Sequence, residues 1–419
     1  MMKLIKIAFK SALNRKVSLS LAIFSIAISI LLLLGVDTMR KQAKSNFLNT
    51  ISQTDLIVGA RSSPTNLLLY SVFHIGNATN NITYASYNDI IASKKVKWSV
   101  PISLGDSHRG FRVMGTNSDY FRYYRYANGQ NLAFQHGTAF SSVYDAVVGI
   151  DVAQSLNYQL NDEITLSHGL VTTKYGEHAD KPFRIVGILQ KTGTPVDRTV
   201  IISLQGIEAI HIDWQSGTRS SLRISAEQAL KMGLQPKNIT AFMLGLNNRI
   251  EVFRLKREIN DYAKEPLLAI MPGSTLAYLW QTLGQFEKVL MAISALVLLA
   301  GLIGLLIALL TTLNERRREM AVLRAVGAHP YHVIILFMLE AMLVVIVGCL
   351  VGIALLYGLQ IIMQPIVAHS YGIYLHAQWP DTMQIIFLGL VLMLAMLLSL
   401  IPGVIAYKRS LQDGLMVKI

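Results

Sequence analysis

Four long apolar runs dominate the pattern of hydrophobic and polar positions along this chain. They cover residues 17–36, 289–313, 332–359 and 383–406. A helix that crosses the hydrocarbon core of a bilayer needs roughly 20 mostly apolar residues, and each run is at least that long. Lys and Arg are absent from all four runs, and Glu340 is the only formally charged residue within them. The pattern therefore predicts four transmembrane helices.

A mixed pattern fills the long stretch between the first and second runs, residues 37–288. Short apolar segments alternate there with Gly, Pro, Asn and Asp, which is typical of strands and turns. Residues 37–54 lack Gly and Pro and predict a helix that continues the first run, and residues 275–288 predict one that leads into the second. About 250 residues suffice for a domain with its own core. We therefore predict an α-helical membrane protein with a large extracytoplasmic α+β domain on helical stalks.

Two further helices are predicted inside this stretch, at residues 152–158 and 250–263. Five segments predict strands, at residues 55–60, 111–115, 146–150, 183–189 and 199–204. Residues 208–264 are interpreted as a separate subdomain.

The composition supports lipid contact. Of the 419 residues, 15% are charged, against roughly 25% in soluble proteins. The net charge of +13 could serve nucleic acid or anionic lipid, but many of the basic residues flank the apolar runs, which favours lipid over nucleic acid. Cys349 is the single cysteine, so the chain has no intramolecular disulfide framework and no cysteine-based zinc cluster.

The distribution of Lys and Arg predicts the orientation of the helices, because cytoplasmic loops carry an excess of these residues. Basic residues are concentrated in the segments 1–16, 314–331 and 407–419, whereas the loop 360–382 has none. Both termini and the Arg-rich loop are therefore predicted to be cytoplasmic, with residues 37–288 and the short loop 360–382 on the other side. The cations at 40, 41 and 44 argue the other way, since they directly follow the first run.

No motif supports an enzyme. The phosphate-binding sequence G-x-x-x-x-G-K-[ST] is absent, so we expect no ATP hydrolysis and no bound cofactor in this chain. The sequences G-x-S-x-G, H-E-x-x-H and C-x-x-C are absent too.

The Arg-rich loop carries the best candidate for function. It predicts a short amphipathic helix that ends at a glycine and is followed by Pro330. Such a helix can lie on lipid headgroups or dock into a partner's groove, and its composition does not choose between them. The candidate residues are Glu315, Arg316, Arg317, Arg318, Glu319, Met320, Leu323, Arg324 and Gly327.

Three weaker candidates lie elsewhere. Glu340, inside the third run, suits a coupling role or a fixed partner for an arginine of the loop. The pair Gly348 and Gly352 allows another helix to approach closely, within or between subunits. His168 and His178 flank a segment with carboxylates and are weak candidates for zinc, because nothing in the sequence fixes their geometry.

The chain resembles the FtsX-like permease family, which includes the MacB-type and LolC/LolE-type proteins of type VII ABC transporters. The resemblance is strongest in the Arg-rich loop and continues into the third run. It extends to the middle of the large domain and to the tail, and the matching segments are 315–328, 334–340, 148–156, 162–164, 183–189, 401–403 and 408–415.

The resemblance implies a function and a set of partners. The Arg-rich loop would be the coupling helix that contacts an ATPase dimer, which binds ATP and Mg²⁺. Two permease copies, expected to be identical, would move their periplasmic domains by mechanotransmission and export or extract a periplasmic or membrane substrate, with a possible periplasmic adaptor or substrate-binding protein. The alternative is an FtsX-like regulatory scaffold that activates a periplasmic partner; a metal-ion-linked transport component is a third reading. The location implied is the bacterial inner membrane.

The sequence departs from the MacB pattern in two places. MacB carries its ATPase on the same chain, whereas 16 residues precede the first run here, so a separate ATPase is expected. The segment 55–81 lies outside the general family pattern and is expected to carry what is special to this branch.

Overall fold

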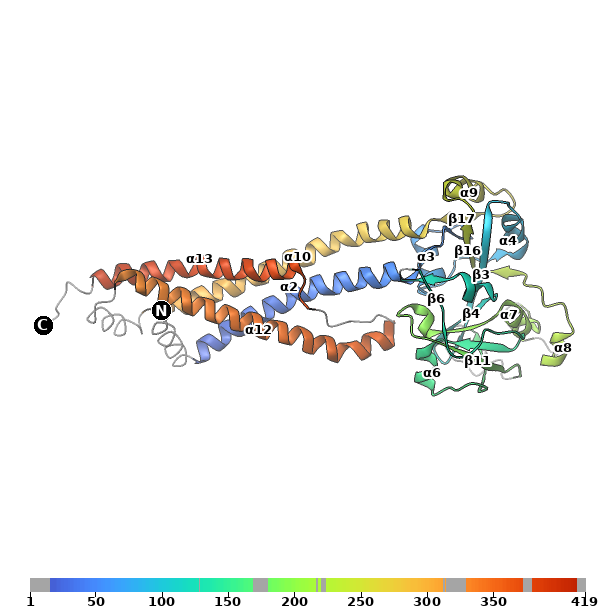
Figure 1. Ribbon diagram of the computed structural model, residues 1–419, viewed down its shortest axis with the longest axis horizontal. Helices are drawn as coiled ribbons and strands as arrows, with labels where there is room; N and C mark the ends of the chain where they lie inside the picture. The colour runs from blue at the N-terminus through green and yellow to red at the C-terminus, as the bar shows by residue number, and fades with distance from the viewer. Residues whose placement is uncertain are drawn as a thin grey trace. The chain divides into compact units, whose positions relative to one another are not determined.

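The computed structural model describes residues 16–127, 129–168, 180–215, 218–219, 224–311, 313, 329–371 and 379–412 (Figure 1). The chain divides into two compact units. One, the helical unit, comprises Met1–Gln42, Gly284–Val367 and Leu375–Ile419. The other, the sheet unit, comprises Ala43–Leu283 and Ala368–Tyr374.

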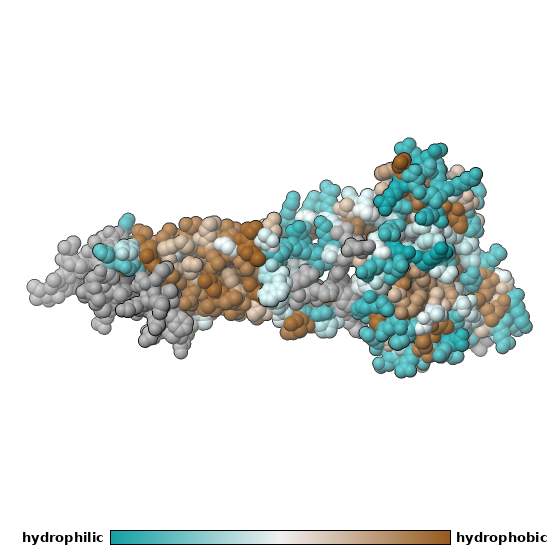
Figure 2. Space-filling model, viewed as in Figure 1, coloured by the Kyte–Doolittle hydropathy of each residue, from teal (hydrophilic) through white to brown (hydrophobic). Residues whose placement is uncertain are grey.

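Four long helices carry the predicted apolar runs. They are α2 (Lys16–Thr50), α10 (Pro272–Thr311), α12 (Pro330–Tyr371) and α13 (Thr382–Gln412). Among the described residues, each contains a stretch long and apolar enough to cross a membrane. Hydrophobic side chains cover much of their outer surface (Figure 2), for example Leu296, Leu350 and Ile385, each more than half exposed. Such a surface suits hydrocarbon rather than water.

The helices α2 and α10 are longer than their apolar runs. Helix α2 continues to Thr50, and α10 begins at Pro272. The helices predicted at residues 37–54 and 275–288 are thus confirmed, with ends displaced by up to four residues. Helices α6 (Ile150–Leu156) and α9 (Val252–Asn260) confirm the two predicted between them.

The described part of the sheet unit is built on one eleven-stranded mixed sheet. Along its main path the order is β17-β1-β16-β3-β4-β12-β8-β11-β7, while β10 pairs with β3 and β9 with β11. The β4–β12 and β8–β11 pairs are parallel, and the other pairs in this sheet are antiparallel. The strands are β1 (Leu56–Ala60), β3 (Val96–His108), β4 (Phe111–Thr116), β7 (Phe134–Gly137), β8 (Asp145–Val148), β9 (Glu163–Ile164), β10 (Ser167–His168), β11 (Phe183–Leu189), β12 (Thr199–Ser203), β16 (Ala241–Leu246) and β17 (Leu267–Ile270). All five predicted strands are among them.

Smaller elements complete the described sheet unit. The helices are α3 (Pro64–Val72), α4 (Tyr84–Ile91), α5 (Asp119–Tyr123), α7 (Leu204–His211), α8 (Ala226–Leu230) and the 3₁₀ turns η1 (Pro195–Arg198) and η2 (Arg249–Glu251). Three two-stranded pairs lie outside the main sheet: β2 (Ile82–Thr83) with β15 (Asn238–Ile239), β5 (Arg125–Tyr126) with β6 (Gln130–Asn131), and β13 (Trp214–Gln215) with β14 (Thr218–Arg219).

The interpretation of residues 208–264 as a separate subdomain is wrong. Strand β16 lies within that range, yet it pairs with β1 on one side and β3 on the other. The strand is also buried at every position. Its hydrogen bonds and its core contacts tie it to the rest of the sheet.

Helices cover both faces of the sheet around β16. Its side chains alternate, so Met243 joins the hydrophobic core that contains Leu67 and Leu68 of α3. Phe242 joins the separate core that contains Leu255 of α9. Burial on both faces explains why β16 reads as a continuous apolar run rather than as an alternating one.

Gly149 directly precedes helix α6, at a point where the chain passes close to η1. The N–H group of Gly149 donates to Thr199 O at 2.9 Å. A Cβ atom at this position would overlap the backbone of Val196 and Asp197, so the contact requires glycine.

We expect Gly149→Ala to destabilise the sheet unit by about 1–3 kcal/mol, because backbone atoms cannot move aside as a flexible side chain can. Thermal unfolding of the full chain in a mild detergent measures the effect. Gly233→Ala is the matched control, since a Cβ there meets no atom within 4 Å. Equal melting temperatures for the two variants would contradict the close contact.

Candidate functional site

Most of the predicted coupling residues lie where the structure gives no description. The segment 314–328, which holds all nine candidates from Glu315 to Gly327, falls outside the described residues. The helices on either side are described: α10 ends at Thr311 and α12 begins at Pro330. The coupling role of this segment stays a prediction.

The structure does not describe the side chains of the two histidines that are weak candidates for zinc. His178 lies outside the described part of the chain, and of His168 only the backbone, in β10, is described. Among described residues, no three His, Cys, Asp or Glu side chains form a group that could hold a metal ion.

Glu340 is buried in the helical unit. Its exposed fraction is 1%, and its neighbours Phe337, Ala341 and Val344 on α12 are fully buried. The carboxyl group therefore faces the packed interior of the helical unit rather than lipid. Whether an arginine of the 314–328 segment is its partner stays a prediction.

Two glycines of α12 lie directly against α2. A Cβ atom on Gly348 would stand 2.7 Å from the Cγ2 atom of Ile26, and one on Gly352 would stand 2.7 Å from the carbonyl oxygen of Ala27. On α10, Gly301 faces α2 in the same way: a Cβ atom on it would stand 2.9 Å from Ser29 Oγ. Small residues thus let three helices of one chain approach closely, as is common in membrane proteins.

A group of polar side chains joins three helices where the apolar run of α2 ends. We call it the helix-end polar cluster, and its members are Asp37, Arg40, Lys41, Glu287, Asp381 and Gln384. Asp37 is its centre, since its side chain is 4% exposed. Lys41 donates to Asp37 Oδ2 at 2.6 Å, and Gln384 Nε2 donates to the same oxygen at 2.9 Å.

Two ion pairs extend the cluster from α2 to its neighbours. Lys41 also pairs with Asp381, just before α13, and Arg40 pairs with Glu287 of α10. Asp381 in turn accepts a 2.9 Å hydrogen bond from the backbone N–H of Gln384 and so caps α13. The hydrogen bond from Lys41 and this backbone bond hold the pKa of Asp381 below its usual value.

The cluster was missed by the sequence analysis, which treated Arg40 and Lys41 only as cations that oppose the predicted orientation. In the structure both residues form ion pairs with carboxylates, so their charges are not uncompensated positive charges next to the first apolar run. The available signal was the spacing of Asp37 and Lys41, four residues apart on a helix. The partners on α10 and α13 had no signal in the sequence.

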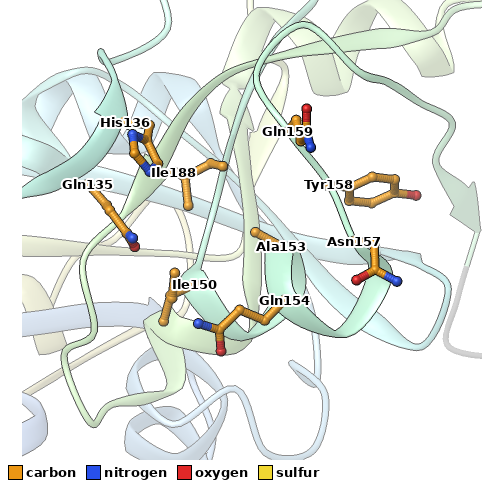
Figure 3. A pocket seen from close by; sticks show the side chains of 9 residues that line it. All are labelled: Gln135, His136, Ile150, Ala153, Gln154, Asn157, Tyr158, Gln159 and Ile188. Carbon is orange, nitrogen blue, oxygen red and sulfur yellow. The ribbon is translucent and has the colours of Figure 1, made fainter.

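A shallow cavity of about 310 Å³ lies in the sheet unit between β7, α6 and β11 (Figure 3). Most of its polar lining is neutral, with Gln135, Gln154, Asn157 and Gln159 around the apolar Ala153. These groups donate and accept hydrogen bonds, but no carboxylate, serine or cysteine lines the cavity beside its histidine.

Comparisons with known families match both units. The model of the MacB-like periplasmic core domain matches residues 19–240. The model of the FtsX-like permease C-terminal region matches residues 291–411. The second match spans the C-terminal half of α10, all of α12 and nearly all of α13, and it includes the 314–328 segment between α10 and α12.

Two curated relatives illustrate the similarity. The macrolide export ATP-binding/permease protein MacB of Wolinella succinogenes is 22% identical over 281 residues, which are 66% of this chain and 40% of that protein. The pyoverdine export ATP-binding/permease protein PvdT of Pseudomonas savastanoi pv. phaseolicola is 28% identical over 204 residues, 44% of this chain and 28% of that protein. The chain thus spans less than half the length of these relatives.

A solved structure, the periplasmic region of MacB from Actinobacillus actinomycetemcomitans, aligns with 55% of this chain and 95% of its own. The sequence identity is 10% and the TM-score is 0.34, which is too low to support an argument about the fold. The family rests on the two family models, of which the core-domain model alone covers more than half of the chain. The chain therefore belongs to the family of permeases with a MacB-like periplasmic core domain and an FtsX-like C-terminal region.

Proposed function

We propose that this chain is the permease component of an ABC transporter that exports or extracts a periplasmic or membrane substrate. An ATPase dimer would bind the 314–328 segment from the cytoplasm, and the core domain would be on the periplasmic side of the inner membrane. The observation that carries the proposal is the presence of both family regions in one chain, with the Arg-rich segment inside the FtsX-like region. The export relatives agree with it.

The mechanism we propose is mechanotransmission. ATP binding would move the coupling segment, and with it α10 and α12, which flank that segment. Helices α10 and α2 are each continuous from an apolar run to residues of the sheet unit. A helix resists bending because every turn is closed by hydrogen bonds, so both can carry a displacement along their axes.

The helix-end polar cluster supports this proposal by linking the helices laterally. Through Arg40 and Lys41, α2 is tied to α10 and to the start of α13. A displacement of α10 would then reach α2 through the ion pair with Glu287 as well as through the apolar packing. We propose that the cluster keeps these helices moving together.

The assembly is tested by affinity purification of the full chain from native membranes in a mild detergent, followed by mass spectrometry. We expect an ATPase in about equal amount, and a second, identical permease copy when two tags are used. Recovery of a cell-wall hydrolase without an ATPase would favour a regulatory scaffold instead and would contradict the transporter.

Reversing charge in the coupling segment tests the docking role. We expect Arg316→Glu with Arg317→Glu and Arg318→Glu to weaken ATPase binding at least about tenfold, or ~1.4 kcal/mol, because like charges would replace complementary ones. Co-purification and substrate-stimulated ATP hydrolysis measure the loss, and an unchanged melting temperature shows that the permease is folded. Lys408→Glu, at an exposed site of α13, is the control. Normal binding by the triple variant would end this assignment.

Removing Lys41 tests the polar cluster. Lys41→Met would remove the nearer of the two cations that pair with the buried carboxylate of Asp37, leaving Arg40 at 4.0 Å, and we expect a loss of up to about 3 kcal/mol in stability. Thermal unfolding in detergent measures the loss, and ATPase stimulation by the purified complex measures its effect on coupling. Lys44→Met removes the same charge from an exposed position on the same helix, and it should change neither the stability nor the ATPase stimulation.

The double variant Asp37→Asn with Lys41→Met should recover most of the stability, because an uncharged amide at position 37 no longer needs a cation. If Lys41→Met unfolds at the same temperature as Lys44→Met, the ion pair with Asp37 does not hold the helices.

A further inference from the structure

A second cavity, of about 280 Å³, lies in the sheet unit beneath the segment 55–81. Its lining includes Tyr70, Asn77, Asn81, Leu104 and Arg112. This volume is close to the lower end of the range for small-molecule sites. Three of these five residues come from the segment that lies outside the general family pattern.

The outer wall of the cavity is the turn that follows α3. The helix ends at Val72, and His74 then adopts a left-handed conformation with φ of 55°, which lets Ile75 N–H bond to Leu69 O. Residues other than glycine seldom adopt this conformation, so the side chain of His74 is expected to have a use there. It reaches β12, where its Nδ1 atom lies 3.0 Å from Thr199 Oγ1.

Arg112 holds the same turn from the neighbouring strand. Strands β4 and β12 are parallel, and their register places Arg112 beside Thr199. The guanidinium donates to Gly76 O at 2.6 Å and to Asn77 Oδ1 at 3.1 and 3.2 Å. Arg112 and Thr199 together therefore anchor the segment that closes the cavity.

The charge of Arg112 has no counter-ion in the described part of the chain. No described carboxylate lies within ion-pair distance of it, and the oxygen atoms that accept its hydrogen bonds are neutral. Those bonds use three of the five guanidinium N–H groups, which leaves two donors. Partial burial lowers the pKa of Arg112, and no nearby acid offsets this. Because Arg112 is only partly buried, its charge and its two remaining N–H donors are accessible to an anion from outside the chain.

His74 adds no second charge. Burial, together with the positive charge of Arg112, lowers its pKa to about 4. The hydroxyl of Thr199 donates its hydrogen to Pro195 O, so it accepts from His74 Nδ1, and the neutral ring carries its proton there. The cavity therefore presents one positive charge at neutral pH.

The remaining lining is partly apolar. Tyr70 is 1% exposed and lies across Gly59, where a Cβ atom would stand 2.6 Å from its hydroxyl oxygen. Within the described chain, that hydroxyl has no hydrogen-bond partner, so it can donate to a ligand. Asn81 Oδ1 lies 3.5 Å from Thr240 Oγ1, and no described residue accepts from the amide N–H groups of Asn81. Leu104 supplies an apolar wall.

We propose that this cavity binds the carboxylate of a small, singly charged and partly apolar molecule. Arg112 pairs with the carboxylate, Tyr70 and Asn81 donate hydrogen bonds to it, and the apolar part lies along Leu104. The site is independent of the ATPase and of the transport mechanism proposed above, because it requires only groups within the sheet unit.

Equilibrium dialysis of radiolabelled benzoate against the full chain in a non-ionic detergent tests the site. We expect saturable binding of one benzoate per chain and no binding of benzamide, which lacks the charge. Arg112→Gln should weaken binding at least tenfold. Arg109→Gln is the matched control, because it removes the same charge from an exposed position on the adjoining turn, and it should stay within twofold.

Tyr70→Phe keeps the ring and removes only the hydroxyl, so it tests the site even if Arg112→Gln does not fold. It should weaken binding severalfold with an unchanged melting temperature. Absence of saturable binding, or equal binding by the variants at 112 and 109, would overturn the site. Displacement of benzoate by inorganic phosphate at a lower concentration than by acetate would overturn the assignment to a carboxylate.

Discussion

The close approach of α12 to α2 at Gly348 and Gly352 is the contact on which the helical unit depends. Lipid chains are as apolar as leucine side chains, so burial of apolar surface does not by itself hold helices together in a bilayer. Close packing does, and it needs small residues that bring whole backbones within van der Waals distance. Helix α2 meets α12 and α10 in this way and is therefore the centre of the helical unit.

Ion pairs and hydrogen bonds fix how far the packed helices are shifted along one another. Apolar contacts alone would let the helices slide, whereas the helix-end polar cluster fixes α2 against α10 and α13 at one level along their axes. Most of its pairs are partly exposed and contribute little each. Asp37 differs because it is buried, and a buried carboxylate without its partners is strongly unfavourable. The cluster thus selects one register of the helices rather than adding much to their net stability.

The sequence predicted the features that depend on local pattern and missed those that depend on contacts between distant segments. The lengths of the apolar runs and the absence of Gly and Pro in residues 37–54 were enough to place the long helices. The parallel pairing of β4 with β12 was not predictable, since 82 residues separate Phe111–Thr116 from Thr199–Ser203. Lys41 and Asp381 are 340 residues apart, so their pairing had no local signal. The error at residues 208–264 has the same cause, since nothing local shows that β16 pairs with β1 and β3, which lie far from it in the chain.

Asp37 and Arg112 show how the partners of a charged side chain indicate its role. Asp37 lies among partners from its own chain, Lys41 and Gln384, so its charge is satisfied when the protein folds. Arg112 is anchored by neutral oxygen atoms, which orient the guanidinium without neutralising it. Because Arg112 is only partly buried, its charge is placed there at a modest desolvation cost and remains accessible from outside the chain. An accessible charge with two remaining donors suits an anionic ligand, and it lies against the segment that departs from the family pattern.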